Sequence, residues 1–150
     1  MDIENYIKKI GLKAKKASYN IASAENNQKN IFLNNLSKKL LDNENKIIAA
    51  NNKDLTEASK QGLDDGFIDR LKLTPKNITA MADGLLQIKE LENPVGNIIN
   101  KNTMPSGIIV GQMRVPLGVI GMIYESRPNV TIDAAGLAIK SGNSIILRGG

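Results

Sequence analysis

The side chains best suited to chemistry lie together in the segment Glu125-Ser-Arg-Pro-Asn129. It follows an apolar run typical of a strand and precedes a run with helical spacing, so we expect a loop at a helix N-terminus. Unpaired backbone N–H groups and the helix dipole favour an anion there. Arg127 adds a planar set of donors that matches phosphate or carboxylate. Asn129 either points its amide at a ligand or simply caps the helix beside a solvated arginine.

Composition excludes several kinds of catalytic site. The 150 residues include no cysteine, histidine or tryptophan. This excludes disulfides, Cys/His zinc sites, Ser-His-Asp triads and a cysteine nucleophile within these residues. We expect no metal site, because no group of aspartates and glutamates has ligand spacing. The chemistry must come from carboxylates, lysines, arginines, hydroxyls, amides and backbone groups.

The glycine and lysine patterns do not match the common nucleotide or nucleic-acid motifs. Gly118-Val-Ile-Gly121 lies inside an apolar run and is neither a dinucleotide fingerprint nor a P-loop. The net charge is +5, and five lysines lie between residues 8 and 16. These lysines flank an apolar stripe, as on a solvated helix face, and the chain has few aromatic residues for base stacking. We therefore expect no nucleic-acid partner.

The segments on either side of the loop predict a strand–helix–strand unit. Apolar runs at 117–124 and 144–148 are typical of strands, and the first is apolar throughout, as in a strand covered on both faces. Residues 130–140 have helical spacing, and Gly142 suits the left-handed position at a helix end. The unit implies a parallel pair of strands. Ligands bind outside the carboxyl ends of such strands, which places the 125–129 loop and the segment from Arg148 onward at a candidate site.

The chain changes character near residue 103. Before it, apolar residues recur at spacings of three and four, as in a series of amphipathic helices, and Thr74-Pro75 is a helix-start pair. Eight of the thirteen glycines come after it, together with a further strand-like run at 108–115. We expect an α/β protein with a helical region at 1–102 and an incomplete α/β region at 103–150.

The chain shows no sign of a membrane span or a secretory signal. It has no uncharged apolar run of the roughly 18 residues that a spanning helix needs. The N-terminus, Met1-Asp-Ile-Glu4, is acidic and has no apolar core. With no cysteine to oxidise, we expect a cytoplasmic protein.

Residues 115–150 resemble gamma-glutamyl phosphate reductase, also called glutamate-5-semialdehyde dehydrogenase. The most specific match is Tyr124-Glu-Ser-Arg-Pro-Asn-Val130, followed by Lys140-Ser-Gly-Asn-Ser-Ile-Ile-Leu-Arg-Gly-Gly150. Asp69-Arg-Leu-Lys-Leu-Thr-Pro75, Met81-Ala-Asp-Gly-Leu85 and Pro94-Val-Gly96 support it, so the resemblance covers most of the chain. It implies the start of an aldehyde-dehydrogenase-like, NADP-binding parallel-sheet domain that stops after one strand–helix–strand unit.

The resemblance also implies an activity and its residues. The family reduces L-glutamyl 5-phosphate to L-glutamate 5-semialdehyde in proline biosynthesis, using NADPH and a cysteine from a later domain. Ser126 and Arg127 are then substrate-binding, and Asn129 holds the oxyanion, unless Arg127 occupies that space. The residues expected to bind cofactor are Tyr124, Glu125, Arg148 and Gly149. Arg148 stands where the wider superfamily has lysine and suits a 2′-phosphate.

Two hypotheses remain open from the sequence. In the first, the chain is part of a homo-oligomeric, NADPH-dependent reductase with a small-molecule substrate. In the second, it is a truncated or split module that only assembles or binds a nucleotide. The 150 residues alone lack a nucleophilic cysteine, so we expect them to be inactive in either case.

Overall fold

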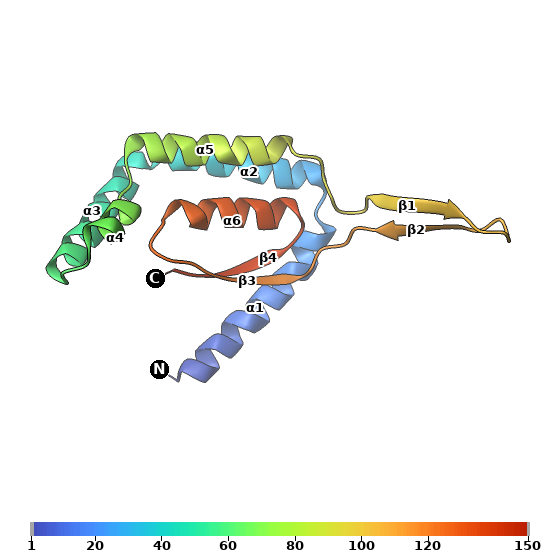
Figure 1. Cartoon of the computed structure of the whole chain (residues 1–150), viewed down its shortest axis with the longest axis horizontal. Coiled ribbons are helices and arrows are strands. Elements are labelled where there is room, and N and C mark those ends of the chain that lie inside the picture. Colours follow the sequence, from blue (N-terminus) through green and yellow to red (C-terminus); the bar gives the residue numbers. More distant parts are fainter. Residues whose placement is uncertain (1, 150) are drawn as a thin grey trace.

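The computed structural model describes residues 2–149; Met1 and Gly150 lie outside the described residues. Helices come first and strands enter after residue 97 (Figure 1). The elements are α1 (Ile3–Ser23), α2 (Asn26–Asp42), α3 (Glu44–Lys60), α4 (Asp65–Leu71), α5 (Pro75–Glu90), β1 (Ile98–Thr103), β2 (Ile109–Met113), β3 (Val119–Ile123), α6 (Asn129–Lys140) and β4 (Ser144–Arg148). This order confirms the predicted α/β class.

The start of α5 is fixed by local sequence, as predicted. The Thr74 hydroxyl accepts a hydrogen bond from the Asn77 backbone N–H at 3.3 Å, and the Asn77 side-chain oxygen accepts from the Thr74 N–H at 2.8 Å. Pro75 occupies the first turn, where no N–H is required. These contacts satisfy donors that a helix end otherwise leaves unpaired, so α5 begins at a defined residue.

The apolar core forms where α2, α5 and α6 meet. Its buried residues come mainly from α2 and α5 and are Leu33, Leu40, Leu73, Ile78, Met81, Leu85 and Ile88. Helix α6 packs against α5 through Gly136, where an added Cβ would lie 2.9 Å from Leu85 Cδ2 and 3.1 Å from Ile88 Cδ1. The missing side chain therefore lets α6 approach the core closely.

Strands β3 and β4 form the predicted parallel pair around α6. Their register runs from Val119 opposite Ser144 to Ile123 opposite Arg148. In Figure 1, α6 lies on one side of the pair and α1 on the other. The turn after α6 uses Gly142 at φ +75°, as predicted. Asn143 follows and accepts the Gly118 N–H at 2.8 Å, which ties the start of β3 to the end of the helix.

The far end of α6 is anchored by a buried lysine. Lys140 Nζ donates to Asn26 Oδ1 at 3.1 Å, Asn30 Oδ1 at 2.7 Å and the Lys89 carbonyl at 2.8 Å. Burial lowers the pKa of Lys140, and Glu90 partly opposes this shift. Lys29 is also buried, and its pKa is lowered by burial first and by the charge of Lys140 second. Helix α6 is thus fixed at both ends, by the loop before it and by this lysine.

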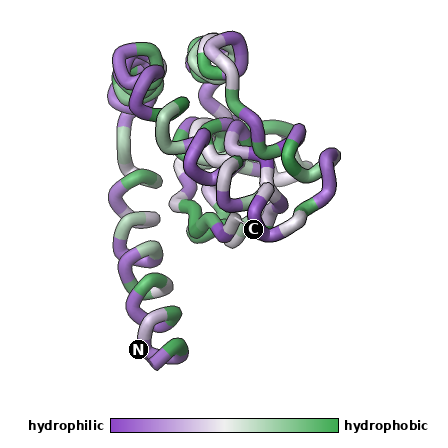
Figure 2. The backbone as a smooth tube through the Cα atoms, turned by 90° about the vertical axis from the view of Figure 1, so that its left-hand side faces the viewer, coloured by the Kyte–Doolittle hydropathy of each residue, from purple (hydrophilic) through white to green (hydrophobic). Residues whose placement is uncertain are grey.

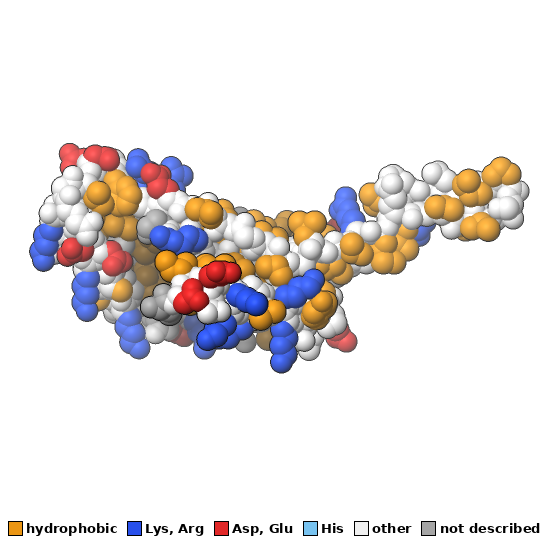
Figure 3. Space-filling model, turned by 90° about the horizontal axis from the view of Figure 1, so that it is seen from below, with side chains coloured by type: hydrophobic (Ala, Val, Ile, Leu, Met, Phe, Trp, Pro, Cys, Tyr) orange, Lys and Arg blue, Asp and Glu red, His pale blue; other side chains and the backbone are white. Residues whose placement is uncertain are grey.

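Strand β1 corrects the expectation that residues 1–102 are all helical. It pairs antiparallel with β2, which lies within the predicted strand at 108–115. All residues of β1 are exposed, and Ile-Ile-Asn-Lys-Asn-Thr has no apolar alternation, so only its partner defines it as a strand. Figure 3 shows hydrophobic side chains along the projecting arm that β1 and β2 form. The boundary predicted between residues 102 and 103 falls inside β1.

Helix α1 packs over only part of its length. The predicted apolar stripe begins with Ile3, Tyr6 and Ile7, which are all exposed. Figure 2 shows the N-terminal part of α1 extending away from the rest of the molecule. Further along, the Ser144 hydroxyl donates to the Ala14 carbonyl at 2.8 Å and joins α1 to β4. Within residues 2–149, no helix is both long and apolar enough to span a membrane.

Candidate functional site

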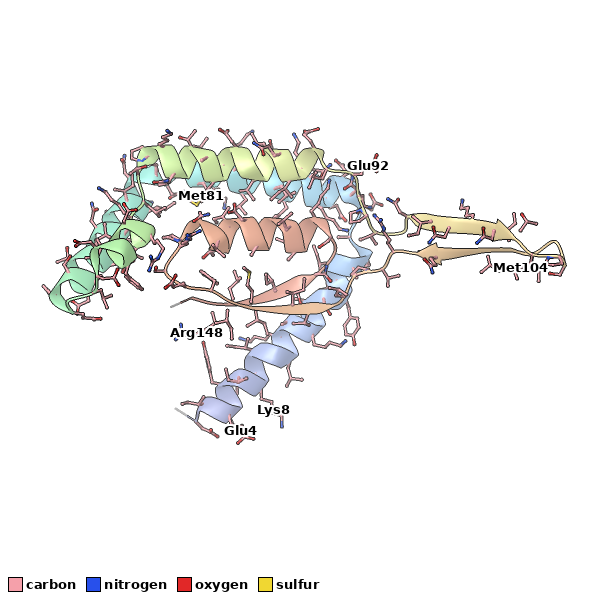
Figure 4. All side chains as sticks on the ribbon, viewed as in Figure 1. Glu4, Lys8, Met81, Glu92, Met104 and Arg148 are labelled. Carbon is pink, nitrogen blue, oxygen red and sulfur yellow. The ribbon has the colours of Figure 1, made fainter. Side chains whose placement is uncertain are left out.

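The loop between β3 and α6 lies at the carboxyl ends of both parallel strands, as predicted. The Tyr124 N–H donates to the Arg148 carbonyl at 3.0 Å, so the first residue of the loop lies beside the end of β4. Arg148 and Gly149 are therefore neighbours of the loop in space. Arg148 itself is exposed and lies, in Figure 4, on the other side of α6 from Met81.

Tyr124 ties the loop to α6. Its hydroxyl lies 2.5 Å from the Thr131 hydroxyl, in the first turns of the helix. A Cβ at Gly149 would lie 3.4 Å from the same Tyr124 oxygen, so the ring lies against the backbone of Gly149. These contacts hold the loop in one position relative to both strands.

Asn129 does not cap α6, so the alternative in which it is a plain N-cap is wrong. It is the first helical residue, and Pro128 precedes it without a side-chain capping bond. The Asn129 amide nitrogen donates to Asp133 Oδ2, one turn further on, at 3.1 Å. Because a primary amide carries two N–H groups, this bond orients the side chain and leaves a second donor for a ligand.

Ser126 and Arg127 lie in the middle of the loop with different exposure. Ser126 is 8% exposed, and its hydroxyl has no hydrogen-bond partner among residues 2–149. A buried hydroxyl without a partner costs about 1–3 kcal/mol, so it is a position where a ligand or a water is favoured. Arg127 is exposed, and no carboxylate of the described residues forms an ion pair with it.

An ion pair connects the loop to α4, and the sequence interpretation did not assign it a role. Arg70 Nε lies 3.4 Å from Glu125 Oε2, and Arg70 Nη2 lies 3.5 Å from Oε1. The Glu125 side chain is 64% exposed, so the pair contributes little to stability and mainly orients the two side chains. The only signal in the sequence was that Arg70 lies in the Asp69–Pro75 segment, 55 residues before Glu125.

Asn51 holds the connection between α4 and α5 beside this ion pair. It is buried; its amide nitrogen donates to the Leu71 carbonyl at 2.9 Å, and its oxygen accepts the Leu73 N–H at 2.8 Å. An asparagine inside a helix gave no signal of this role, because both partners lie about twenty residues away. Its bonds fix the backbone directly after Arg70.

Two cavities border the loop, and Arg127 lines both. The first, of about 410 Å³, lies between the α4–α5 connection, α5 and the start of α6, and Asn129, Asp133 and Met81 line it (Figure 4 labels Met81). The second, of about 450 Å³, lies against α3 and α4, and Tyr124, Glu125, Ser126 and Gly149 line it. All the predicted site residues except Arg148 thus line one of two neighbouring cavities. No three carboxylates among residues 2–149 are arranged to hold a metal ion.

Comparison of the sequence with those of known proteins finds gamma-glutamyl phosphate reductases. A gamma-glutamyl phosphate reductase from Caldanaerobacter subterraneus is 53% identical over 138 residues, which is 92% of this chain and 33% of the relative. The resemblance to gamma-glutamyl phosphate reductases is confirmed. The chain spans about a third of the length of the curated relatives that it matches. No protein-family model matches it.

Crystal structures of two gamma-glutamyl phosphate reductases share the fold. The enzyme from Thermotoga maritima has a TM-score of 0.87 and is 38% identical, covering 92% of this chain and 33% of its own. The enzyme from Saccharomyces cerevisiae has a TM-score of 0.89 and is 34% identical, covering 95% of this chain and 36% of its own. The succession of helices, hairpin and strand–helix–strand unit is therefore an arrangement that reductases of this name also have.

Proposed function

We propose that this chain is part of an NADPH-dependent reductase that converts L-glutamyl 5-phosphate to L-glutamate 5-semialdehyde in proline biosynthesis. The 53% identity to a gamma-glutamyl phosphate reductase, over 92% of the chain, carries this proposal. The loop at the carboxyl ends of β3 and β4 supports it, because that is where open α/β sheets bind their ligands. A biosynthetic role of this kind places the protein in the cytoplasm.

In this proposal, the loop residues bind and orient the substrate. Arg127 pairs with an anionic group, and the unpartnered hydroxyl of Ser126 donates to an oxygen of the ligand. The second amide hydrogen of Asn129 donates to the acyl oxygen, where charge develops, while Asp133 holds that side chain in position. The Arg70–Glu125 pair fixes the side of the loop that faces α4.

The residues at the strand ends suit NADPH, which supplies a hydride when bound. The Arg148 backbone lies beside the loop, and its guanidinium is exposed, which makes it a suitable partner for a 2′-phosphate. Gly149 has no side chain, which lets the Tyr124 ring lie against its backbone at the end of β4. Glu125 adds an acceptor for a hydroxyl group. These residues bind and position the cofactor; they form no covalent bond with it.

Arg148→Ala tests the cofactor assignment in the protein expressed from the whole reading frame that contains this chain. The assay is the phosphate-dependent oxidation of L-glutamate 5-semialdehyde. We expect the KM for NADP⁺ to rise about tenfold or more, as for loss of a charge-assisted contact, and the KM for NAD⁺ to stay unchanged. Arg114→Ala, on the segment after β2, is the matched control and should change neither. Equal effects of Arg148→Ala on both cofactors would contradict the 2′-phosphate role, and no turnover by the parent protein would contradict the reductase.

The projecting β1–β2 arm suits homo-oligomer assembly. Ile109 is 68% exposed, Val110 52% and Met113 58%, which is unusual for neighbouring apolar side chains of a strand. A second copy would cover these side chains and the unpaired edges of the hairpin. Light scattering of the parent protein and of Ile109→Lys tests this: assembly should be lost in the variant, and a monomeric parent would contradict the proposal.

A second candidate function is a non-catalytic module that only assembles or binds a nucleotide. The composition favours it, since these residues contain neither cysteine nor histidine. The polypeptide of these 150 residues should then show no turnover at any pH. Turnover by that polypeptide would exclude this alternative.

A further inference from the structure

The first cavity carries charges of both signs. Its charged lining residues are Arg70, Lys72 and Arg127 together with Asp69 and Asp133, and they come from α4, the α4–α5 connection, the loop and α6. Its volume of about 410 Å³ lies within the range of about 300–1,000 Å³ that is typical of small-molecule pockets. The cavity therefore has the size and the polarity of a ligand site.

This combination of charges favours a zwitterion. A ligand with only anionic groups would face the carboxylates of Asp69 and Asp133, and like charges in one site are destabilising. A ligand with only cationic groups would face Arg127 and Lys72. A ligand with one ammonium and one carboxylate group can pair with both kinds of side chain. Buried Met81 and Leu73 provide apolar contact for a short aliphatic chain.

We infer that this cavity binds the α-amino and α-carboxylate groups of an amino-acid substrate, with Asp133 paired to the ammonium and Arg127 to the carboxylate. Arg127 suits this role because it is exposed and forms no ion pair within residues 2–149, whereas Arg70 is engaged by Glu125. Asp133 accepts one bond from Asn129, and a carboxylate has further acceptor positions for an ammonium group.

The position of Asp133 on α6 determines how the ligand is oriented in the cavity. Asp133 lies four residues after Asn129, which is about 6 Å along the helix axis. If Asn129 faces the reacting acyl group, the Asp133 carboxylate lies beside it, because its Oδ2 is 3.1 Å from the Asn129 amide nitrogen, and the two groups can contact the two ends of a short side chain. Asp133 then contacts the amino-acid end of the substrate and Asn129 the reacting end, and these two side chains are hydrogen-bonded to each other.

The experiment measures which ligands lose affinity when each charge is removed. This inference rests on the proposed function for its choice of probes: L-glutamate, glutarate, which lacks the ammonium group, and 4-aminobutanoate, which lacks the α-carboxylate. Ligand-observed NMR measures their binding to the protein expressed from the whole reading frame that contains this chain. Asp133→Asn should weaken L-glutamate and 4-aminobutanoate about tenfold and leave glutarate unchanged. Arg127→Gln should weaken L-glutamate and glutarate and leave 4-aminobutanoate unchanged.

The control and the opposing outcomes separate this inference from the proposed function. Asp83→Asn removes an exposed carboxylate of α5 that does not line the cavity, and it should change no affinity. Equal weakening of all three ligands by Asp133→Asn would show that Asp133 acts only through Asn129 and would overturn the inference, whether or not the protein is a reductase. The ligand-selective losses would support it even in a protein without reductase turnover. If Asp133→Asn does not fold, Asp133→Ser provides the same comparison.

Discussion

The side chains around Gly136 in α6 determine how much a methyl group added at this position destabilises the protein. In Gly136→Ala, the new Cβ lies 2.9 Å from Leu85 Cδ2 and 3.1 Å from Ile88 Cδ1, and both side chains are buried in the core. Overpacking of this kind costs about 1–3 kcal/mol. Alanine also gains about 1 kcal/mol over glycine in a helix interior, so the net loss is about 0–2 kcal/mol.

The same substitution at a second glycine measures the helix-propensity gain without any overpacking. Gly11 lies inside α1, and nothing lies within 4 Å of a Cβ placed there. Gly11→Ala should therefore stabilise the protein by about 1 kcal/mol, as propensity alone requires. The free energy of unfolding of the two variants, measured in urea, should differ by about 1–3 kcal/mol, the overpacking cost alone. Equal stabilisation by both substitutions would refute the close α5–α6 contact described above.

Two further predictions concern buried polar groups. Asn51→Leu should lower the free energy of unfolding by about 1–3 kcal/mol in urea, because it leaves backbone groups of residues 71–73 unpaired. Exposed Asn52→Leu is the control, and equal effects of the two would contradict this role. Burial and the charge of Lys140 lower the pKa of Lys29 in the folded protein below its usual value of 10.5. The stability contributed by Lys29 is therefore complete above pH 10.5, the pKa of an unfolded lysine, and is lost as the pH falls through the lowered pKa of the folded state. Lys29→Met should therefore gain more stability over the parent at pH 7 than at pH 10.5; a gain independent of pH would contradict this.

Local signals in the sequence predicted the elements that carry them. Thr74-Pro75 has both halves of a helix start, and Gly142 has the backbone freedom that the end of α6 requires. The apolar runs at 117–124 and 144–148 were sufficient for β3 and β4, because apolar, β-branched runs on either side of a helix are typical of a strand–helix–strand unit. The position of the 125–129 loop followed from these elements.

The remaining features depend on residues that are distant in the sequence. Strand β1 is defined by its pairing with β2, and its own residues show no strand pattern. Arg70 joins the site only because α4 packs beside the loop, 55 residues further on. Asp133 is different: its spacing of four from Asn129 on one helix was visible in the sequence, and that contact was predictable.

The bond between Ser144 and Ala14 also constrains the order in which the chain can fold during synthesis. The two residues are 130 positions apart, and ribosomes add about 5–20 residues per second. Helix α1 is therefore synthesised roughly 6 to 26 s before the strand that holds it. Helix α1 therefore cannot dock on β4 until nearly the whole of this chain has been made.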